Sequence, residues 1–533
     1  MNKRPYIYLP IFFALVLILG MLLGTLLIPA IQSKNGIFSF DLERYDKIQQ
    51  VISYIEDEYV DSTSRAGLEE MTINGLLQQL DPHSVYISAE DFNEANDPLK
   101  GNFDGIGIQF RIIRDSITVI SIIPGGPSET AGLLAGDRIV KVDGKVVAGT
   151  KISNDDAVKM LKGPRGTRVR VGLFRPSESK SLEKTITRGN IPTSSIDFFY
   201  MATPDAGYIR LSRFSNTSGA EFLQAANQLK EKGMKKLVLD LRGNGGGVMD
   251  AAIEIADQFL GDKKLIVYTE GYHRKKQEYL ATSAGELEGF PVVVMIDEFS
   301  ASASEILAGA LQDQDAGIIV GRRSFGKGLV QEQIMMPDGS ALRLTVARYH
   351  TPTGRCIQKP YTEDFEKYYA DFYKQFMSDE DYQDSMNFAD TTAYTTPSGR
   401  IVYGGGGIMP DVYVSARSTA SSDYYKKLRS QGIISNFAFD YADQRRKVLA
   451  SYKDAAGFVR GFVVTQDLLR QLTAYAQKNN IPPDPAGLSA SEALIKAELK
   501  ASIGQVIFND PAFYPVLLPE DVMFREALKK LSE

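Results

Sequence analysis

The chain has 533 residues, a formal net charge of −6, one cysteine and three histidines. A small negative charge over this length excludes the basic surface that nucleic-acid binding requires, so we expect no nucleic-acid partner. The single cysteine, Cys356, excludes an intrachain disulfide, and His83, His273 and His350 lie too far apart in sequence for a metal-site pattern. The length predicts about three or four domains, and we expect no metal.

A long uncharged stretch occupies the amino terminus. Lys3 and Arg4 precede a segment without charge from Pro5 to Ser33, which is long enough for a helix across a bilayer, since a span takes about 20 residues. A cleaved signal peptide or a buried helix are the alternatives, but the apolar run exceeds a usual signal sequence and no clear cleavage site follows. Positive charge before the span predicts a cytoplasmic amino terminus. We therefore expect residues 1–33 to form a single-pass membrane anchor, with the bulk of the chain on the extracytoplasmic (periplasmic) side.

Residues 34–91 are predicted to form a helical arm. Apolar residues recur there at helical spacing in two segments, and polar residues fill the gaps. These positions are Ile48, Val51, Ile52 and Ile55, then Leu68, Met71, Ile73, Leu76 and Leu77. Such an arm packs on the core or on a second copy of the chain, so a homo-oligomer is one expectation. His83 follows at a proline turn, where we interpret it as structural.

Short strands around one helix are predicted in residues 92–190. The strands are Ile106–Phe110, Ile117–Ile122 and Arg168–Phe174, and the helix is Asp155–Lys162. The patterns P-x-x-x-A-G-L from Pro127 and G-D-x-I-x-x-V-D-G from Gly136 resemble those of PDZ domains. A PDZ domain binds a carboxyl terminus at a glycine-bearing loop and adds the peptide as a strand.

The loop that matches a PDZ carboxylate site lies within Phe103–Ile108, where successive backbone N–H groups can bind an anion. Apolar side chains of the predicted helix are expected to line the pocket for the last side chain of the tail. The expected peptide-binding residues are Gly105, Ile106, Gly107, Ile108, Val158 and Leu161. The plain alternative is that these glycines only make a tight entry into a strand. The resemblance implies that the partners are C-terminal tails of protein substrates.

Strands alternate with helices in residues 191–415, which predicts an α/β core similar to the crotonase-like superfamily. Strands are predicted at Ala206–Leu211 and Lys236–Leu241, with the helix Gly219–Lys232 between them. Beyond Pro360 the chain turns acidic and tyrosine-rich, and we interpret that part as an insertion or a flexible flap.

A glycine run, Arg242-Gly-Asn-Gly-Gly-Gly247, follows the second of these strands and opens another helix. Val248 breaks the G-x-G-x-x-G pattern of dinucleotide sites, so the run is better suited to the close approach of a substrate. We assign an oxyanion-hole N–H to Gly246, or to Gly247 one residue on, beside the N–H of Ala303.

The stretch Phe299–Gln331 carries the candidate chemistry. Three serines alternate with alanines after a buried strand, and Ser302 can project its hydroxyl from the start of a helix, where N–H groups and the helix dipole favour an oxyanion. Lys327 lies between two glycines, and a lysine in an apolar pocket can lose its proton and act as a base. The pair predicts a Ser–Lys hydrolase.

Each member of this pair has a plainer interpretation. Ser302 and Glu305 form an S-x-x-E capping box, so the serine could simply cap a helix. Gly321–Lys327 fits a P-loop pattern, but Gly328 stands where a P-loop needs the Ser or Thr hydroxyl that binds magnesium. Nucleotide binding is therefore disfavoured, and we expect no cofactor.

A family resemblance covers roughly residues 40 to 415. In the order of the family, the chain carries Leu80-Asp-Pro-His-Ser84, Leu239-Asp-Leu-Arg-Gly-Asn244 with Gly246-Gly247, S-A-S-A-S-E-I around Ser302, F-G-K-G-x-V-Q around Lys327, Tyr349-His-Thr-Pro-Thr-Gly-Arg355 and Gly406-Gly-Ile-Met-Pro-Asp411. Together these motifs resemble the carboxyl-terminal processing (tail-specific) protease family. The resemblance implies a serine endopeptidase in which Ser302 is the nucleophile, Lys327 the general base and Gln331 the group that orients the lysine.

Two other functions remain open from the sequence. One is a membrane-anchored PDZ adaptor with an inactive, protease-like core. The other is a serine hydrolase that uses His83 or His350 in a conventional triad, although neither histidine lies in a pattern that orients a nucleophile. Residues 416–533 are predicted to be a mainly helical extension, for which we expect a role in assembly or as a lid.

Overall fold

The computed structural model describes residues 12–22, 42–175, 180–361, 368, 392–415 and 421–533. The chain divides into two compact units, Met1–Leu77 and Gln78–Glu533. Most of the predicted insertion after Pro360 lies outside the described residues.

The predicted membrane anchor is corrected by the structure. The first helix that the structure describes covers residues 12–22. Among the residues that the structure describes, no helix is both long and apolar enough to cross a membrane. This finding contradicts the single-pass anchor, the cytoplasmic amino terminus and the periplasmic placement that the uncharged stretch predicted.

The predicted helical arm begins with two helices, α2 (Leu42–Glu58) and α3 (Arg65–Leu77). Arg65 forms ion pairs with Glu56 on α2 and with Glu69 one turn along its own helix. Both pairs are exposed, so each contributes little to stability. The two predicted helical segments are present, but residues 34–41 lie outside the described residues and Val85–Ile87 forms a strand, so the boundaries 34–91 of the arm and the homo-oligomer stay predictions.

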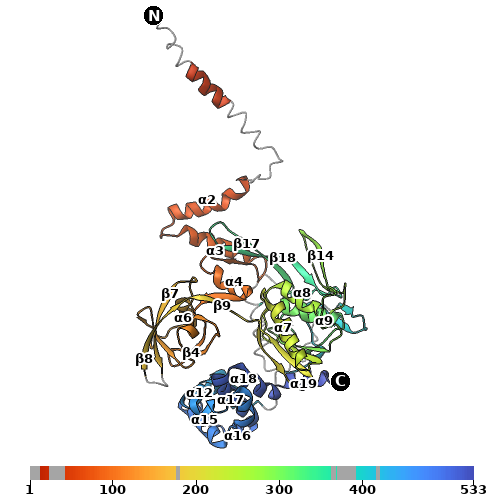
Figure 1. The fold of residues 1–533 in the computed structure, drawn as a ribbon. Coiled ribbons are helices and arrows are strands. Elements are labelled where there is room, and N and C mark those ends of the chain that lie inside the picture. Colours follow the sequence, from red (N-terminus) through yellow and green to blue (C-terminus); the bar gives the residue numbers. More distant parts are fainter. Residues whose placement is uncertain (1–11, 23–41, 176–179, 362–367, 369–391, 416–420) are drawn as a thin grey trace. The chain divides into compact units, whose positions relative to one another are not determined.

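A six-stranded sheet forms the centre of the second unit, in the order β10-β11-β12-β15-β16-β21. Figure 1 draws this part of the chain mainly in yellow and green. The strands are β10 (Ile196–Met201), β11 (Ala206–Leu211), β12 (Lys236–Asp240), β15 (Val292–Ile296), β16 (Ile318–Gly321) and β21 (Val412–Tyr413). Pairing is parallel from β11 to β21, and only β10 is antiparallel to its neighbour. The α/β fold predicted for this region is thereby confirmed.

Alternation along the central strands sends side chains to both faces of the sheet. Val292, Val294 and Ile296 belong to one buried cluster, whereas Val293 and Met295 belong to another. The first cluster is covered by α7 (Ser218–Glu231), α8 (Met249–Asp257) and α9 (Ala303–Asp313). The second is covered by α18 (Asp510–Leu517), the short helix Leu518–Glu520 and α19 (Val522–Lys530). The sheet is therefore buried on both faces, which explains its continuous apolar strands.

A second, antiparallel sheet carries five further strands of the core, and β19 (Ala393–Thr395) and β20 (Ile401–Tyr403) form a separate pair. The order of the five-stranded sheet is β1-β18-β13-β14, and β17 pairs with β18. The strands are β1 (Val85–Ile87), β13 (Leu265–Gly271), β14 (Arg274–Leu280), β17 (Leu329–Met335) and β18 (Ala341–His350). Because β17 begins directly after the predicted lysine loop, the position of that loop depends on this sheet as well as on the central one.

The predicted PDZ region forms its own small sheet with its own core. A pair of strands, β2 (Asn102–Gly105) and β9 (Gly189–Pro192), connects it to the chain on either side. Its elements are β3 (Ile108–Ile112), β4 (Ile117–Ile122), α5 (Pro127–Thr130), β5 (Arg138–Val142), β6 (Lys145–Val146), α6 (Asn154–Leu161), β7 (Arg168–Arg175) and β8 (Lys180–Thr187). The prediction of short strands and one principal helix is confirmed.

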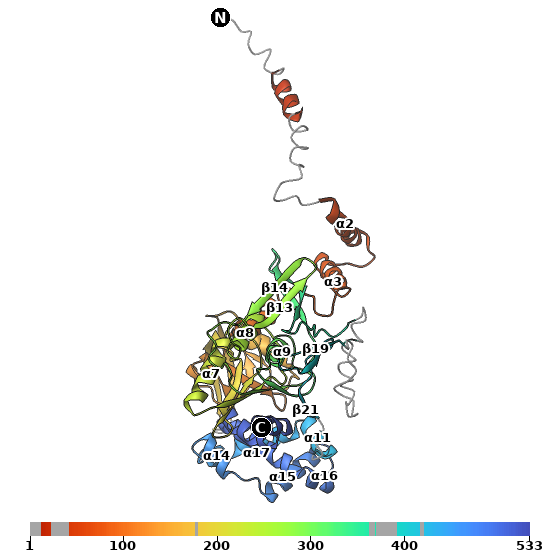
Figure 2. The same cartoon turned by 90° about the vertical axis from the view of Figure 1, so that its right-hand side faces the viewer.

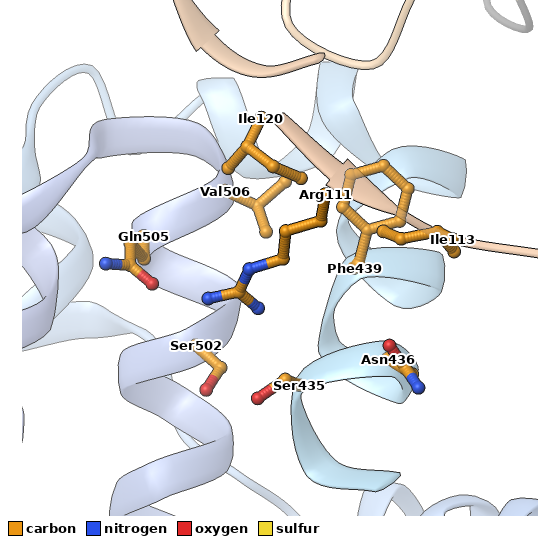
Figure 3. A pocket seen from close by; sticks show the side chains of 9 residues that line it. All are labelled: Arg111, Ile113, Ile120, Ser435, Asn436, Phe439, Ser502, Gln505 and Val506. Carbon is orange, nitrogen blue, oxygen red and sulfur yellow. The ribbon is translucent and has the colours of Figure 1, made fainter. Parts of the chain in front are cut away.

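The C-terminal extension is helical, as predicted, and its helices share one apolar core (Figure 2). They are α11 (Asp423–Ser430), α12 (Ile433–Gln444), α13 (Arg446–Ala450), α14 (Ala455–Gly461), α15 (Gln466–Lys478), α16 (Pro485–Ala490) and α17 (Glu492–Phe508). A pocket lies between β3 and β4 of the PDZ region and α12 and α17. Figure 3 shows the Arg111 side chain extending into this pocket, toward Ser435 and Ser502. No residue of the candidate catalytic loops lines it.

A buried charge network joins the end of the chain to the central sheet. Asp240, at the end of β12, is fully buried and accepts hydrogen bonds from Tyr208, Arg210 and Arg242. Arg242 also donates to Asp521 at 2.6 Å, and Asp521 caps α19 by accepting from the N–H groups of its first turn. The last helix is therefore held to the residue that precedes the glycine run.

We expect Asp521→Ala to lower the free energy of unfolding by about 1 kcal/mol through the lost cap and by up to about 1 kcal/mol more through the lost ion pair. Asp521→Asn keeps a good capping group and should show only the second loss. The chain contains no tryptophan, so unfolding in urea is best followed by circular dichroism. Wild-type stability in both variants would contradict this role for Asp521.

Candidate active site

Three neighbouring parallel strands deliver the candidate catalytic loops. β12 and β16 flank β15 on its two sides. The glycine run follows β12, the serine loop follows β15, and the lysine loop follows β16. Since the carboxyl ends of parallel strands meet at one edge of a sheet, the fold brings these three loops together.

Ser302 differs from the two serines beside it. Ser300 and Ser304 are fully buried, and their hydroxyls donate to the carbonyls of Leu241 and Asn244, at 2.9 and 2.8 Å. Ser302 is only half-buried, and its backbone has φ of 56° and ψ of −113°. This left-handed conformation is strained for a residue with a side chain, and such strain is typical of functional sites. The structure thus singles out Ser302 among the three.

The glycine run lies against the serine loop. A side chain at Gly246 would meet the Ala301 carbonyl at 2.6 Å and the Ala303 nitrogen at 2.9 Å, so only glycine fits there. The Gly246 N–H, however, donates to the Asn244 side chain at 2.9 Å. Ala303 is the first residue of α9, and an N–H at that position has no partner within the helix.

The Lys327 amine is directed by Gln331. It donates to Gln331 Oε1 at 2.9 Å, and the Gln331 amide donates in turn to the His83 carbonyl. Burial lowers the pKa of Lys327 below its usual value, and the nearby Arg343 guanidinium lowers it further, against opposing effects of Asp81 and Glu305. The lysine is thus poised for the loss of its proton.

Glu305 connects the serine loop to the lysine loop. Its carboxylate accepts from the backbone N–H of Ser302 at 2.8 Å and from that of Lys327 at 2.9 Å. It also accepts from the Gly326 N–H at 2.7 Å and from the Ser324 hydroxyl at 2.5 Å. The side chain is fully buried, and burial raises its pKa to about 7. The capping interpretation of Glu305 was therefore correct but incomplete.

Tyr349 forms a second connection that the sequence did not reveal. Its buried hydroxyl lies 2.7 Å from the Lys327 carbonyl oxygen and 3.1 Å from that of Ser302. Burial raises the pKa of this hydroxyl well above its usual value, so it remains a neutral donor. The only sequence signal was its place at the head of the Tyr349–Arg355 motif.

The two histidines of the alternative triad lie in different settings. The His350 ring stacks on Tyr268 and its Nδ1 lies 3.2 Å from the Gly354 carbonyl. His83 lies beside Lys327, and burial together with the lysine charge lowers its pKa to about 4. An imidazole with that pKa is a weak base at neutral pH.

The predicted tail-binding residues lie on one loop and one helix of the PDZ region. Gly105, Ile106 and Gly107 are buried between β2 and β3, and Gly107 has φ of 76°, which favours glycine. Leu161 is buried in the same apolar core as Ile106, whereas Val158 and Ile108 are half-buried. The loop and the helix therefore share one core, as the PDZ resemblance implies.

Comparison with known proteins agrees with this geometry. Residues 205–366 match the peptidase family S41, residues 118–175 match the PDZ domain, and residues 424–509 match a family of unknown function. The chain is 39% identical over 315 residues to a carboxy-terminal-processing protease of Bartonella bacilliformis, a match that covers 58% of this chain and 71% of the relative. The chain belongs to the carboxy-terminal processing protease family.

Other relatives have similar names. The carboxy-terminal processing protease CtpB of Bacillus subtilis is 35% identical over 317 residues, which cover 59% of this chain and 65% of that protein. A solved photosystem II D1 C-terminal processing protease is 28% identical, with a TM-score of 0.36, over 69% of this chain and 86% of that one. The protease described here is therefore a serine-type enzyme with a PDZ domain.

The Glu305 contacts predict a specific loss in this protease. Glu305→Gln replaces one acceptor oxygen by an amide that faces N–H donors, so the two loops should move apart. A displacement of about 1 Å can lower kcat on the order of 100-fold, and we expect a loss of that size in peptide hydrolysis.

The matched control for this variant is Glu221→Gln. Glu221 also lies in the first turn of a helix, α7, and accepts from the Ser195 N–H and the Thr217 hydroxyl, remote from the dyad loops. It should lose stability but keep kcat per folded molecule. Equal kcat in the two variants would show that Glu305 does not hold the site.

Proposed function

We propose that this protease is a serine endopeptidase that binds protein C-terminal tails through its PDZ domain and cleaves near the carboxyl end. In this proposal Ser302 is the nucleophile, Lys327 the general base and Gln331 the group that orients the lysine. The observation that carries it is the Glu305 carboxylate, which binds the backbone N–H groups of both Ser302 and Lys327. A plain helix cap would not need the second of these bonds.

The proposed reaction begins with a neutral Lys327 amine. It takes the proton of the Ser302 hydroxyl as Oγ attacks the carbonyl carbon of the scissile peptide bond. The lysine then gives this proton to the leaving amine, and an acyl-enzyme remains. A water molecule, deprotonated by the same lysine, hydrolyses the ester and restores Ser302.

The negative charge that develops on the substrate oxygen requires preorganised donors. We assign these to the Ala303 N–H and to Gly247. The sequence favoured Gly246, with Gly247 as the alternative, but the Gly246 N–H donates to the Asn244 side chain, so we now prefer Gly247. Gly247 is exposed, and a side chain there would meet the Phe214 carbonyl oxygen at 1.9 Å, so this position requires glycine.

Neither alternative function has comparable support. The adaptor hypothesis does not explain why a half-buried lysine with a lowered pKa and a strained serine are bound to the same carboxylate. The triad hypothesis would require His83 or His350 as a base. Among the described residues, the ring contacts are of another kind: His83 Nε2 lies 3.4 Å from the Tyr368 hydroxyl, and His350 Nδ1 lies 3.2 Å from the Gly354 carbonyl. The single-pass anchor of the adaptor is also contradicted.

Replacement of the dyad tests the mechanism. Ser302→Ala and Lys327→Arg should each lower kcat by about 10⁴-fold or more, because arginine keeps the charge but does not deprotonate in proteins. The wild-type rate should rise with pH as the lysine loses its proton. Rates are measured on an unfolded protein substrate by mass spectrometry, and folding is checked by circular dichroism. A turnover near wild type in folded Lys327→Arg would transfer the role of base to another residue.

Amidation of a substrate tail tests its capture. If the loop Gly105–Ile108 binds carboxylates, an amidated tail should bind about tenfold or more weakly than a free one, because a charge-assisted hydrogen bond contributes about 1.5–3 kcal/mol. Affinities of matched peptides are measured by calorimetry with the Ser302→Ala protein. Val158→Ser should lower the affinity for both tails. Asp155 is exposed on the same helix, and Asp155→Ser should leave both affinities unchanged. Equal affinity for free and amidated tails would leave these glycines with a structural role only.

A further inference from the structure

A short turn, Asp81-Pro-His-Ser84, lies against the candidate base. Asp81 is buried, and its Oδ1 accepts from the backbone N–H groups of His83 at 2.8 Å and of Ser84 at 2.9 Å. Its Oδ2 accepts from the Ser84 hydroxyl at 2.5 Å, and that hydroxyl oxygen accepts from the Thr345 N–H of β18 at 3.1 Å. The carboxylate thus fixes the turn and the turn is attached to the antiparallel sheet.

The His83 carbonyl on this turn determines which end of Gln331 faces the lysine. The carbonyl can only accept, so the Gln331 amide group must point toward it and Oε1 must point toward Lys327. A neutral amine that donates to Oε1 keeps its lone pair free for the Ser302 proton. In the reverse orientation the Gln331 amide would donate to that lone pair and the lysine could not act as a base.

We propose that Asp81 is a positioning residue for the Lys327 base, because the turn that it closes presents the carbonyl that orients Gln331. This proposal rests on the Ser–Lys mechanism proposed above. The side chain of Asp81 touches neither the substrate nor the reacting atoms, and it acts through the backbone of His83 and the side chain of Gln331.

Asp81 also contributes a negative charge near the base. Two other charged groups act on Lys327, Arg343 on β18 and Glu305 on α9. The nearby His83 imidazole has its pKa lowered to about 4 and is neutral at the working pH. Asp81 raises the pKa of Lys327, against the larger lowering by burial and by Arg343. Removal of its charge should therefore lower the lysine pKa, and the rate should begin to rise at lower pH.

Two substitutions separate the geometry from the charge. Asp81→Asn keeps an acceptor for the His83 and Ser84 N–H groups, so kcat at high pH should stay within about tenfold of wild type. The rising limb of the plot of kcat against pH should move to lower pH by about one unit or less in Asp81→Asn. Asp81→Ala removes the acceptor, and kcat should fall on the order of 100-fold with KM within about twofold. The measurement is kcat and KM against pH, on a peptide substrate with a free carboxyl terminus.

The matched control is Asp338→Ala. Asp338 makes a similar Asp–Ser turn, accepting from the Ser340 N–H and hydroxyl between β17 and β18, and it is exposed. Asp338→Ala should change neither kcat nor the pH at which kcat begins to rise. A purely structural role for Asp81 would reduce only the folded fraction of Asp81→Ala and leave kcat per folded molecule at the wild-type value, and that result would overturn the proposal.

Further outcomes distinguish a failure of the Asp81 proposal from a failure of the Ser–Lys mechanism. If Asp81→Ala does not fold, Asp81→Glu takes its place, because it keeps the charge but displaces the acceptor oxygens from the His83 and Ser84 N–H groups. A folded Asp81→Glu enzyme with the wild-type kcat overturns the proposal. If Ser302→Ala and Lys327→Arg are inactive while Asp81→Ala keeps the wild-type kcat and pH profile, the positioning role fails and the Ser–Lys mechanism stands. Wild-type activity in Ser302→Ala and Lys327→Arg would contradict the Ser–Lys mechanism and therefore also the positioning role of Asp81.

Discussion

The Glu305 carboxylate accepts four hydrogen bonds in a fully buried position, and the donors come from both loops of the candidate dyad. The start of α9 and the start of β17 cannot separate without leaving a buried carboxylate short of donors. Removal of one partner from a buried charge typically costs about 3–5 kcal/mol. The relative position of Ser302 and Lys327 is therefore set by their backbones, and their side chains remain available for chemistry.

This arrangement lowers the stability of the fold near neutral pH. Burial raises the pKa of Glu305 from 4.5 to about 7, so between these values the folded chain binds a proton that the unfolded chain has released. The favourable contribution of the neutral form is present below pH about 4.5 and is lost as the pH rises through about 7. The ionised form, however, is the one that can accept all four hydrogen bonds. The fold is therefore less stable at a pH above about 7, where Glu305 is ionised and accepts all four hydrogen bonds. Such a loss of stability is common where a site depends on a buried polar network.

The sequence predicted the central elements well because their patterns are local. The apolar run before the serines became β15, and the strands Ala206–Leu211 and Ile117–Ile122 formed at the predicted residues. The candidate nucleophile and base were assigned through the family resemblance of their motifs, because local chemistry alone left a plain helix cap open. The roles of Asp81 and Tyr349 could not be predicted, because each depends on a contact across a long stretch of chain. At the amino terminus, hydrophobicity alone led to a wrong prediction. The uncharged stretch has the composition of a membrane-spanning helix, but no helix among the described residues is long and apolar enough to cross a membrane.

The elements around the base have opposing effects on Lys327, and their balance explains how a lysine can serve where histidine is more usual. Burial and Arg343 favour the neutral amine, whereas Asp81 and Glu305 favour the charged one. With burial alone the amine would be a weaker base, since a lower pKa means a smaller tendency to take the serine proton. The carboxylates moderate this effect, and both are already required for geometry, Glu305 for the loops and Asp81 for the turn. In the proposed mechanism these two acidic side chains hold a loop and a turn beside the lysine and also raise its pKa against the effect of burial, which links the architecture of the candidate site to its electrostatics.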